Sequence, residues 1–157
     1  MDLISFLSRY GISKTTNFDL KDMSYDLGLD IKVIMRDEFI SSIESTNKDL
    51  IIMNLQTTKD KGSHWVCIFK SPEDITSSDT ESFVKSNTNY YDSWNIYFDP
   101  YGVLPTKEVL KVLPNIKYNE TQVQPEGSEM CGQLSLYVLY RLNLGDDFET
   151  IISNFLL

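Results

Sequence analysis

Residues 131–145 read CGQLSLYVLYRLNLG, and this stretch decides the fold. Apolar side chains recur on nearly every side of the helix that it would form, and not along one stripe only. They are Leu134, Leu136, Tyr137, Val138, Leu139, Tyr140 and Leu142. A helix that is apolar all round has to be covered on all sides, so we expect residues 131–144 to form a buried helix in the middle of the fold. Gly145 is a typical residue to end it.

The segments around this helix are typical of a sheet with further helices. Short runs of aromatic, β-branched and other apolar residues predict strands at 50–55, 64–69 and 90–98, and a more polar edge strand at 116–123. Helices are expected from Asp2 to Gly11, from Asn17 to Gly28, from Pro105 to Val112 and over 148–156. Residues 29–40 fit either a strand or a helix start, and 71–89 are predicted to form a long surface loop. The whole chain, residues 1–157, is therefore expected to be one α+β domain with a largely antiparallel central sheet flanked by helices.

The composition narrows the classes of function. The formal net charge of −9 argues against nucleic acid as a partner. Two cysteines and one histidine make neither a disulfide framework nor a multi-histidine zinc site, and we expect no metal and no cofactor. No apolar run reaches the length of about 18 residues that suggests a membrane span, and the N-terminus does not look like a secretory signal. We expect an intracellular protein that does not act at a membrane.

Cys131 and His64 are the candidates for a nucleophile and its base. Cys131 begins the buried helix, where unpaired backbone N–H groups favour a thiolate. His64 is the sole imidazole and begins a predicted strand. Each residue also has a plain structural interpretation, as a buried core cysteine and as a hydrogen-bonded histidine. Strand alternation predicts that Cys67 points away from His64 and serves in packing.

Asp99 and Gln124 complete a set of residue types that acyl transfer needs. Asp99 ends a predicted strand, where its carboxylate can orient an imidazole; the alternative is a turn-forming aspartate before Pro100. Gln124 can donate an amide N–H to an oxyanion together with the backbone N–H of Cys131; the alternative is a surface glutamine. Taken together, the four residues predict a nucleophile, a base, its orienter and an oxyanion donor.

Four segments together resemble the clan of the adenovirus maturation protease, adenain, and the SUMO-specific proteases. They are GSHW at 62–65, FDPYG at 98–102, QVQP at 122–125 and SEMCG at 128–132. Adenain has a similar Phe-Glu-Pro-Phe-Gly element, and its glutamine precedes the cysteine by the same interval as Gln124 precedes Cys131. In its compact length the chain looks closer still to the proteases of virophages and Maverick/Polinton elements. The resemblance covers roughly residues 50–145.

The resemblance implies a fold and a function. The fold is a central sheet with the catalytic cysteine on a buried helix, and the function is cleavage of capsid-protein precursors during virion assembly. This places the protein in the virion and in the cytoplasmic virus factory of the host cell. Asp99 replaces the glutamate of adenain, as in the SUMO-specific branch. Adenain uses DNA and a disulfide-linked viral peptide as activators; the acidic charge and the expected strand position of Cys67 argue against that activation here.

Residues beside these four are candidates for substrate contacts. Gly132 would let a substrate backbone approach the nucleophile, while Ser128 is a candidate helix cap. Ser128, Glu129 and residues 34–38 are candidates for the walls of a groove. Trp65 either walls the histidine or packs in the core. Two other functions remain open: an isopeptidase that removes a ubiquitin-like modifier, and a catalytically silent module that binds capsid protein. The plainest alternative is an α+β domain without an active site.

Overall fold

The computed structural model describes residues 1–43, 47–57, 64–72 and 94–155. Nearly all of the loop predicted at 71–89, and the first part of the strand predicted at 90–98, lie outside the described residues. Within the described part the chain is a single α+β domain, as the sequence predicts.

The described residues form a five-stranded sheet in which the strands follow one another in chain order. The strands are β1 (Lys32–Met35), β2 (Asp49–Asn54), β3 (Trp65–Lys70), β4 (Asn95–Phe98) and β5 (Ile116–Tyr118). The two central pairs, β2–β3 and β3–β4, are antiparallel, but β1–β2 and β4–β5 are parallel. The expectation of a largely antiparallel sheet is therefore wrong, because helical crossovers join the outer strands to their neighbours where hairpins would have made antiparallel pairs.

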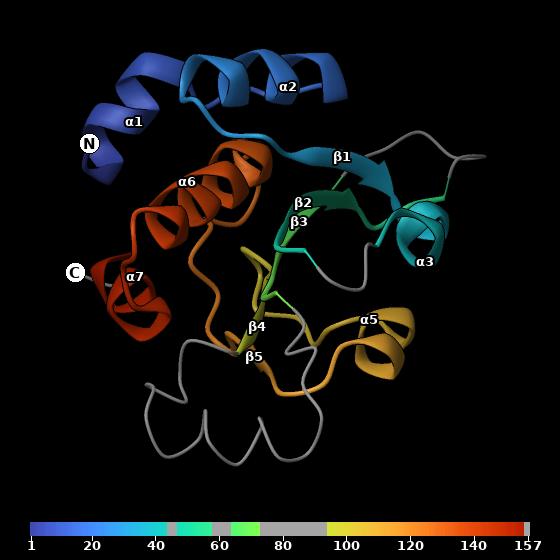
Figure 1. Cartoon of the computed structure of the whole chain (residues 1–157). Helices are drawn as coiled ribbons and strands as arrows, with labels where there is room; N and C mark the ends of the chain where they lie inside the picture. The colour runs from blue at the N-terminus through green and yellow to red at the C-terminus, as the bar shows by residue number, and fades with distance from the viewer. Residues whose placement is uncertain (44–46, 58–63, 73–93, 156–157) are drawn as a thin grey trace.

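Helices cover both faces of this sheet, as Figure 1 shows. One face carries α1 (Leu3–Tyr10), α2 (Asn17–Asp26), α6 (Cys131–Asn143) and α7 (Phe148–Phe155). The other carries the 3₁₀ turn η1 (Arg36–Glu38), α3 (Phe39–Ser42) and α5 (Lys107–Val112). Each face has its own hydrophobic core, and the strand at the centre, β3, contributes alternate side chains to both.

The buried helix predicted from residues 131–144 is α6. It packs on β3, and nearly all of its residues are buried beneath α1, α2 and α7. Tyr140, Arg141 and Asn143, near its C-terminal end, are its more accessible residues. Gly145 follows the helix with φ of 97°, a conformation that glycine adopts most readily. The sequence thus identified the element on which the fold is built.

Two predicted helix starts move by a residue or two. α2 is capped by Thr16, not Asn17, since the Thr16 hydroxyl accepts from the backbone of Asp19 in a capping box. α5 is capped by Thr106, so that Pro105 lies just before the helix. In the described part of the chain, no helix is both long and apolar enough to cross a membrane.

Candidate active site

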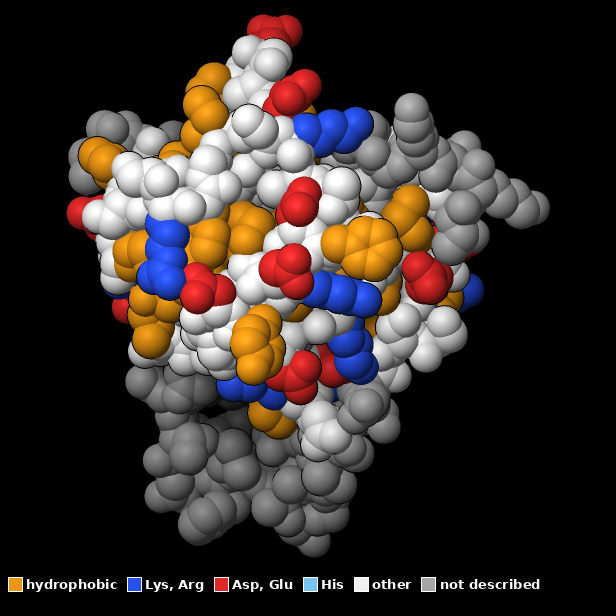
Figure 2. Space-filling view, turned by 90° about the horizontal axis from the view of Figure 1, so that it is seen from above, with side chains coloured by type: hydrophobic (Ala, Val, Ile, Leu, Met, Phe, Trp, Pro, Cys, Tyr) orange, Lys and Arg blue, Asp and Glu red, His pale blue; other side chains and the backbone are white. Residues whose placement is uncertain are grey.

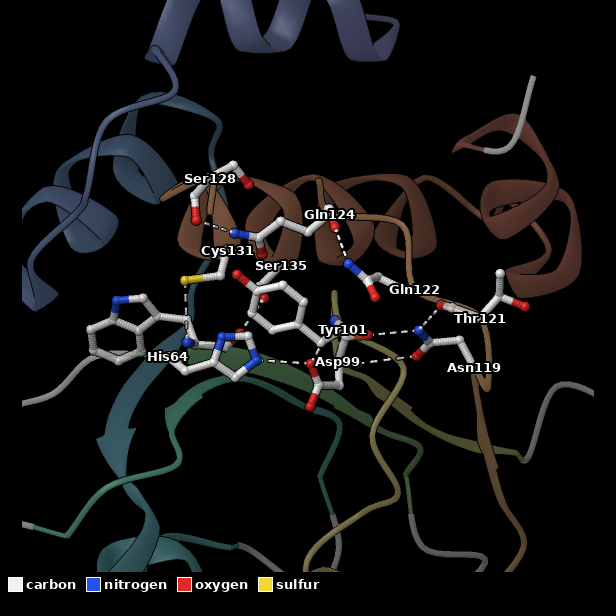
Figure 3. A network of polar contacts seen from close by, with 11 residues as sticks. His64, Asp99, Tyr101, Asn119, Thr121, Gln122, Gln124, Ser128, Cys131 and Ser135 are labelled. Atoms are coloured by element: carbon white, nitrogen blue, oxygen red, sulfur yellow. Dashed lines mark hydrogen bonds and ion pairs between the residues drawn. The ribbon is translucent and has the colours of Figure 1, made fainter. Parts of the chain in front are cut away.

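The four predicted residues lie at one end of the sheet, where β3 begins, β4 ends and α6 starts (Figure 3). Because β3 and β4 are antiparallel neighbours, the residue before β3 lies beside the residue after β4. These two residues are His64 and Asp99. Cys131 is the first residue of α6, which packs across β3. Residues distant in sequence therefore meet because of the strand order and the position of α6.

His64 is held by Asp99. The Nε2 atom of His64 lies 2.8 Å from Oδ1 of Asp99, whose side chain is almost entirely buried. The same Oδ1 accepts the backbone N–H of Tyr101 at 2.8 Å, and the Tyr101 ring stacks on the imidazole with the ring centroids 4.9 Å apart. A carboxylate on Nε2 leaves Nδ1 of the ring for the thiol of Cys131. Asp99 thus has the position of an orienter.

Cys131 lies in surroundings that favour its thiolate. Its Sγ accepts the backbone N–H of Trp65 at 3.5 Å. Burial raises the pKa of Cys131, but a hydrogen bond with His64, the N–H groups of Trp65 and Gly132 and the charge of His64 outweigh burial and lower this pKa below its ordinary value. The position at the start of α6 acts in the same direction, because the helix dipole stabilises a negative charge there.

The pKa of His64 shifts in the opposite direction. Burial lowers it, but hydrogen bonds to Asp99 and Cys131 and the negative charges of both groups outweigh burial and raise the pKa of His64 to about 9. A raised histidine pKa and a lowered cysteine pKa together favour a thiolate–imidazolium pair at neutral pH. This pair is the charge state that a cysteine nucleophile needs.

Cys67 has the opposite environment. It belongs to β3 and is fully buried in the core between the sheet and α6. Burial alone raises the pKa of its thiol well above the ordinary value. As the strand alternation predicts, Cys67 shares its face with Trp65, whereas Val66 and Ile68 point to the other core. His64 escapes this alternation because it precedes the strand, and its ring can reach the start of α6.

Gln124 is almost completely buried, with 1% of its surface exposed, and is tied to the segment that leads into α6. Its Nε2 donates to the backbone oxygen of Ser128 at 2.8 Å, which occupies one of its two N–H bonds. The remaining N–H and the backbone N–H of Cys131 are the candidate donors to an oxyanion. The surface position that the alternative interpretation requires is not observed.

Two loops fix Asp99 and Gln124 relative to one another. The backbone oxygen of Pro100 accepts the N–H groups of Val123 and Gln124, at 2.8 and 3.0 Å. Gly102 has φ of 74°, and a Cβ there would come within 2.8 Å of the backbone carbon of Thr121. Such a close approach of two backbones is open only to glycine. The orienter and the candidate oxyanion donor are therefore parts of one rigid loop pair.

Asn119 is a site residue that sequence reasoning missed. Its buried amide donates to the backbone oxygen of Asp99 at 2.6 Å and accepts the backbone N–H of Asp99 at 3.1 Å. The same Nδ2 donates to the oxygen of Thr121 at 3.1 Å. Asn119 thus holds the backbone of the orienter. The parallel pairing of β4 with β5 would have indicated this role, because residues that follow two parallel neighbouring strands meet at one edge of the sheet.

No protein-family model matches this chain, and a search of curated proteins finds no relative. The chemistry of the site is therefore judged by its own geometry. Among the described residues, no three or more histidine, cysteine, aspartate or glutamate side chains lie close enough together to hold a metal ion.

The remaining predicted residues have varied surroundings. Ser128 does not cap α6: Met130 occupies the cap position, and the Ser128 hydroxyl donates to the backbone oxygen of Pro125. The Cα of Gly132 faces Thr15, Leu20 and Trp65, so its close contact in this structure is with the protein itself.

Trp65 is buried, and its indole N–H donates to the backbone oxygen of Thr15 at 3.2 Å. Glu129 is exposed just before α6. Within 34–38, Ile34 belongs to the core on the far face of the sheet, and Arg36 pairs with Glu108 at 3.3 Å. Glu129 and the exposed part of 34–38 therefore remain the accessible candidates for substrate contacts.

Proposed function

We propose that the protein is a cysteine endopeptidase with Cys131 as nucleophile, His64 as base, Asp99 as orienter and Gln124 as oxyanion donor. One observation carries the proposal. The only histidine of the chain lies between a buried carboxylate and a thiol at a helix start, and the pKa values of histidine and thiol shift toward an ion pair.

The geometry supports a two-step acyl transfer. The thiolate of Cys131 attacks the carbonyl carbon of the scissile peptide bond, and Gln124 Nε2 with the Cys131 N–H stabilises the oxyanion. His64 gives its Nδ1 proton to the leaving amine, which leaves a thioester on Cys131. His64 then takes a proton from water, the hydroxide attacks the thioester, and the thiolate and imidazolium form again as the acid product leaves.

The proposed substrate is a capsid-protein precursor, cleaved in the virus factory or in the virion. This part rests on the resemblance of the GSHW, FDPYG, QVQP and SEMCG segments to the adenain clan. The buried α6 that begins with Cys131 agrees with the fold which that resemblance implies. The proposed steps call on no cofactor, because every group that they use, apart from the substrate and the water that the second step consumes, is on the chain.

The test is incubation of the purified protein with the capsid protein of the same genome, followed by mass mapping of the products. We expect defined cleavage products with the natural chain and with Cys67→Ser, and none with a folded Cys131→Ala. Turnover by Cys131→Ala would refute the assignment of the nucleophile. Release of a ubiquitin-like modifier from conjugates, with intact capsid protein, would identify an isopeptidase. A binding module would do neither, and its Cys131 would react no faster with iodoacetamide than an ordinary thiol.

A further inference from the structure

The aromatic ring of Tyr101 lies against the imidazole of His64. The ring centroids are 4.9 Å apart and the two ring planes are inclined by 29°, as the close-up in Figure 3 shows. Trp65, the other aromatic residue expected to wall the histidine, packs into the core beneath α6, and its indole N–H is bonded to the backbone oxygen of Thr15. In the described part of the chain, Tyr101 is therefore the aromatic side chain that stacks on the imidazole.

One hydrogen bond does not fix the plane of a histidine ring. The contact of Nε2 with Oδ1 of Asp99 anchors one corner of the imidazole of His64. The χ2 torsion of histidine has a broad energy profile, and a hydrogen bond tolerates a deviation of roughly 30° from linearity. A tilt of that size would change the position of Nδ1 relative to Sγ of Cys131. The face of Tyr101 opposes a tilt toward it, because the atoms of the two rings would overlap.

Tyr101 can restrain the imidazole because its own position is fixed. Its backbone N–H donates at 2.8 Å to Oδ1 of Asp99, the same atom that holds the imidazole. Pro100 and Gly102, on either side of it, are tied by close backbone contacts to residues 121–124. The carboxylate and the ring face therefore belong to one turn, and both meet the imidazole in a fixed geometry.

We propose that Tyr101 is a positioning residue for the base, whose ring face holds the imidazole of His64 at the tilt that directs Nδ1 toward Sγ of Cys131. This role rests on the proposed function, in which that imidazole and that sulfur act together on a substrate. The hydroxyl of Tyr101 has no hydrogen-bond partner among the described residues, so the flat face of the ring carries the role.

Two substitutions at this position separate the face from the hydroxyl. Tyr101→Leu keeps an apolar side chain and removes the flat face, whereas Tyr101→Phe keeps the face and removes the hydroxyl. If the imidazole tilts, the hydrogen bond and the charge that lower the pKa of Cys131 are weakened. In Tyr101→Leu we therefore expect the acid limb of iodoacetamide labelling of Cys131 to move to higher pH. We also expect kcat for a cleaved peptide to fall about 10–10²-fold at unchanged KM. Tyr101→Phe should recover most of both losses.

The matched control makes the same substitution away from the site. Figure 2 looks onto α1 and α2, and no histidine shows among the charged and apolar side chains on that face. α2 carries Tyr25, which is 88% exposed. Tyr25→Leu should therefore leave the pH profile of labelling and kcat at the values of the natural chain. Urea titrations show that each variant compared is folded.

A measurement on the natural chain does not depend on the folding of any variant. The chain has a single histidine, so NMR gives one set of imidazole signals. A ring stacked on the imidazole should shift its protons upfield from the positions of an unstacked histidine, and this shift should persist in Tyr101→Phe. Imidazole protons without an upfield shift would overturn the proposal. So would a folded Tyr101→Leu with the natural labelling profile, or a Tyr101→Phe that loses as much as Tyr101→Leu.

The labelling and NMR measurements use no substrate, so failure of this proposal differs from failure of the proposed function. If the natural chain cleaves no peptide while labelling and imidazole signals change as expected, the peptidase assignment fails and Tyr101 still positions His64 on the thiol. If the natural chain cleaves peptide and Tyr101→Leu changes neither kcat nor the labelling profile, the peptidase assignment stands and the positioning role is refuted.

Discussion

The two cysteines of this chain have the same side chain, and the surroundings of each thiol decide how reactive it is. Cys67 lies inside β3, and burial alone acts on its thiol. Cys131 lies above the first residue of the same strand, where it gains an N–H from Trp65, the start of α6 and the imidazole of His64. Both residues are buried, and their pKa values nevertheless move in opposite directions. Charge and hydrogen bonding, not exposure, make the difference.

The largest expected effect on activity comes from removing the imidazole. Its removal should abolish the difference between the pKa shifts of the two cysteines. In His64→Ala the hydrogen bond and the charge that lower the pKa of Cys131 are lost, and burial is left to raise it. We expect kcat/KM for a cleaved peptide to fall about 10²–10⁴-fold. Alkylation of Cys131 at neutral pH should slow at the same time, which mass spectrometry after iodoacetamide treatment would measure. Unchanged alkylation would show that His64 does not activate this thiol.

A second variant should separate reactivity of the thiol from turnover. Gln124→Ala removes the candidate oxyanion donor and leaves His64 and Cys131 in place. We expect kcat to fall about 10²–10³-fold while the alkylation rate of Cys131 stays near that of the natural chain. Measuring both rates on one preparation makes the comparison direct. Equal losses in both rates would mean that Gln124 supports the loop structure and not the oxyanion.

How much of this site the sequence predicts depends on how far apart in the sequence the interacting residues lie. The apolar pattern of residues 131–145 is local, and it correctly places α6 and its first residue. The residue types of His64, Asp99 and Gln124 agree with a resemblance to one clan, and the structure brings all three to the start of α6. The parallel outer pairs of the sheet depend on crossovers between distant segments, which alternation within a strand does not reveal.

Contacts between loops distant in sequence account for what the sequence does not reveal. Nothing in the local sequence marks Asn119, whereas its side-chain amide holds the backbone of Asp99. Packing also requires the glycine at 132, because the Thr15 hydroxyl fills the place where a Cβ would lie; the approach of substrate to Gly132 stays a prediction. Both roles depend on which loop lies against which, and a single sequence contains no local signal for that.

The pH dependence of activity tests the ion pair. The expected change in activity is smaller than the change from either substitution. The thiolate–imidazolium pair requires a pH above the lowered pKa of Cys131 and below the raised pKa of His64, about 9. We therefore expect kcat/KM to rise with pH on the acid side, to be high at neutral pH and to fall about tenfold per pH unit above the pKa of His64. An alkaline limb near the ordinary histidine value would show that Asp99 and Cys131 do not raise the pKa of His64.

The smallest effect on activity is expected at Cys67. In Cys67→Ser a hydroxyl replaces a thiol in the core between the sheet and α6, so the free energy of unfolding should fall by about 1–3 kcal/mol in urea titrations. The proposed active site lies where β3 begins and not within the strand, so the folded variant should cleave at the natural rate, and Cys131 should still be labelled at neutral pH. A folded but inactive Cys67→Ser, or one in which labelling disappears, would move the nucleophile from the start of α6 into the strand. The same outcome would remove the reason for placing His64 in the mechanism, because Cys67 faces the core and has no imidazole among the causes of its pKa shift.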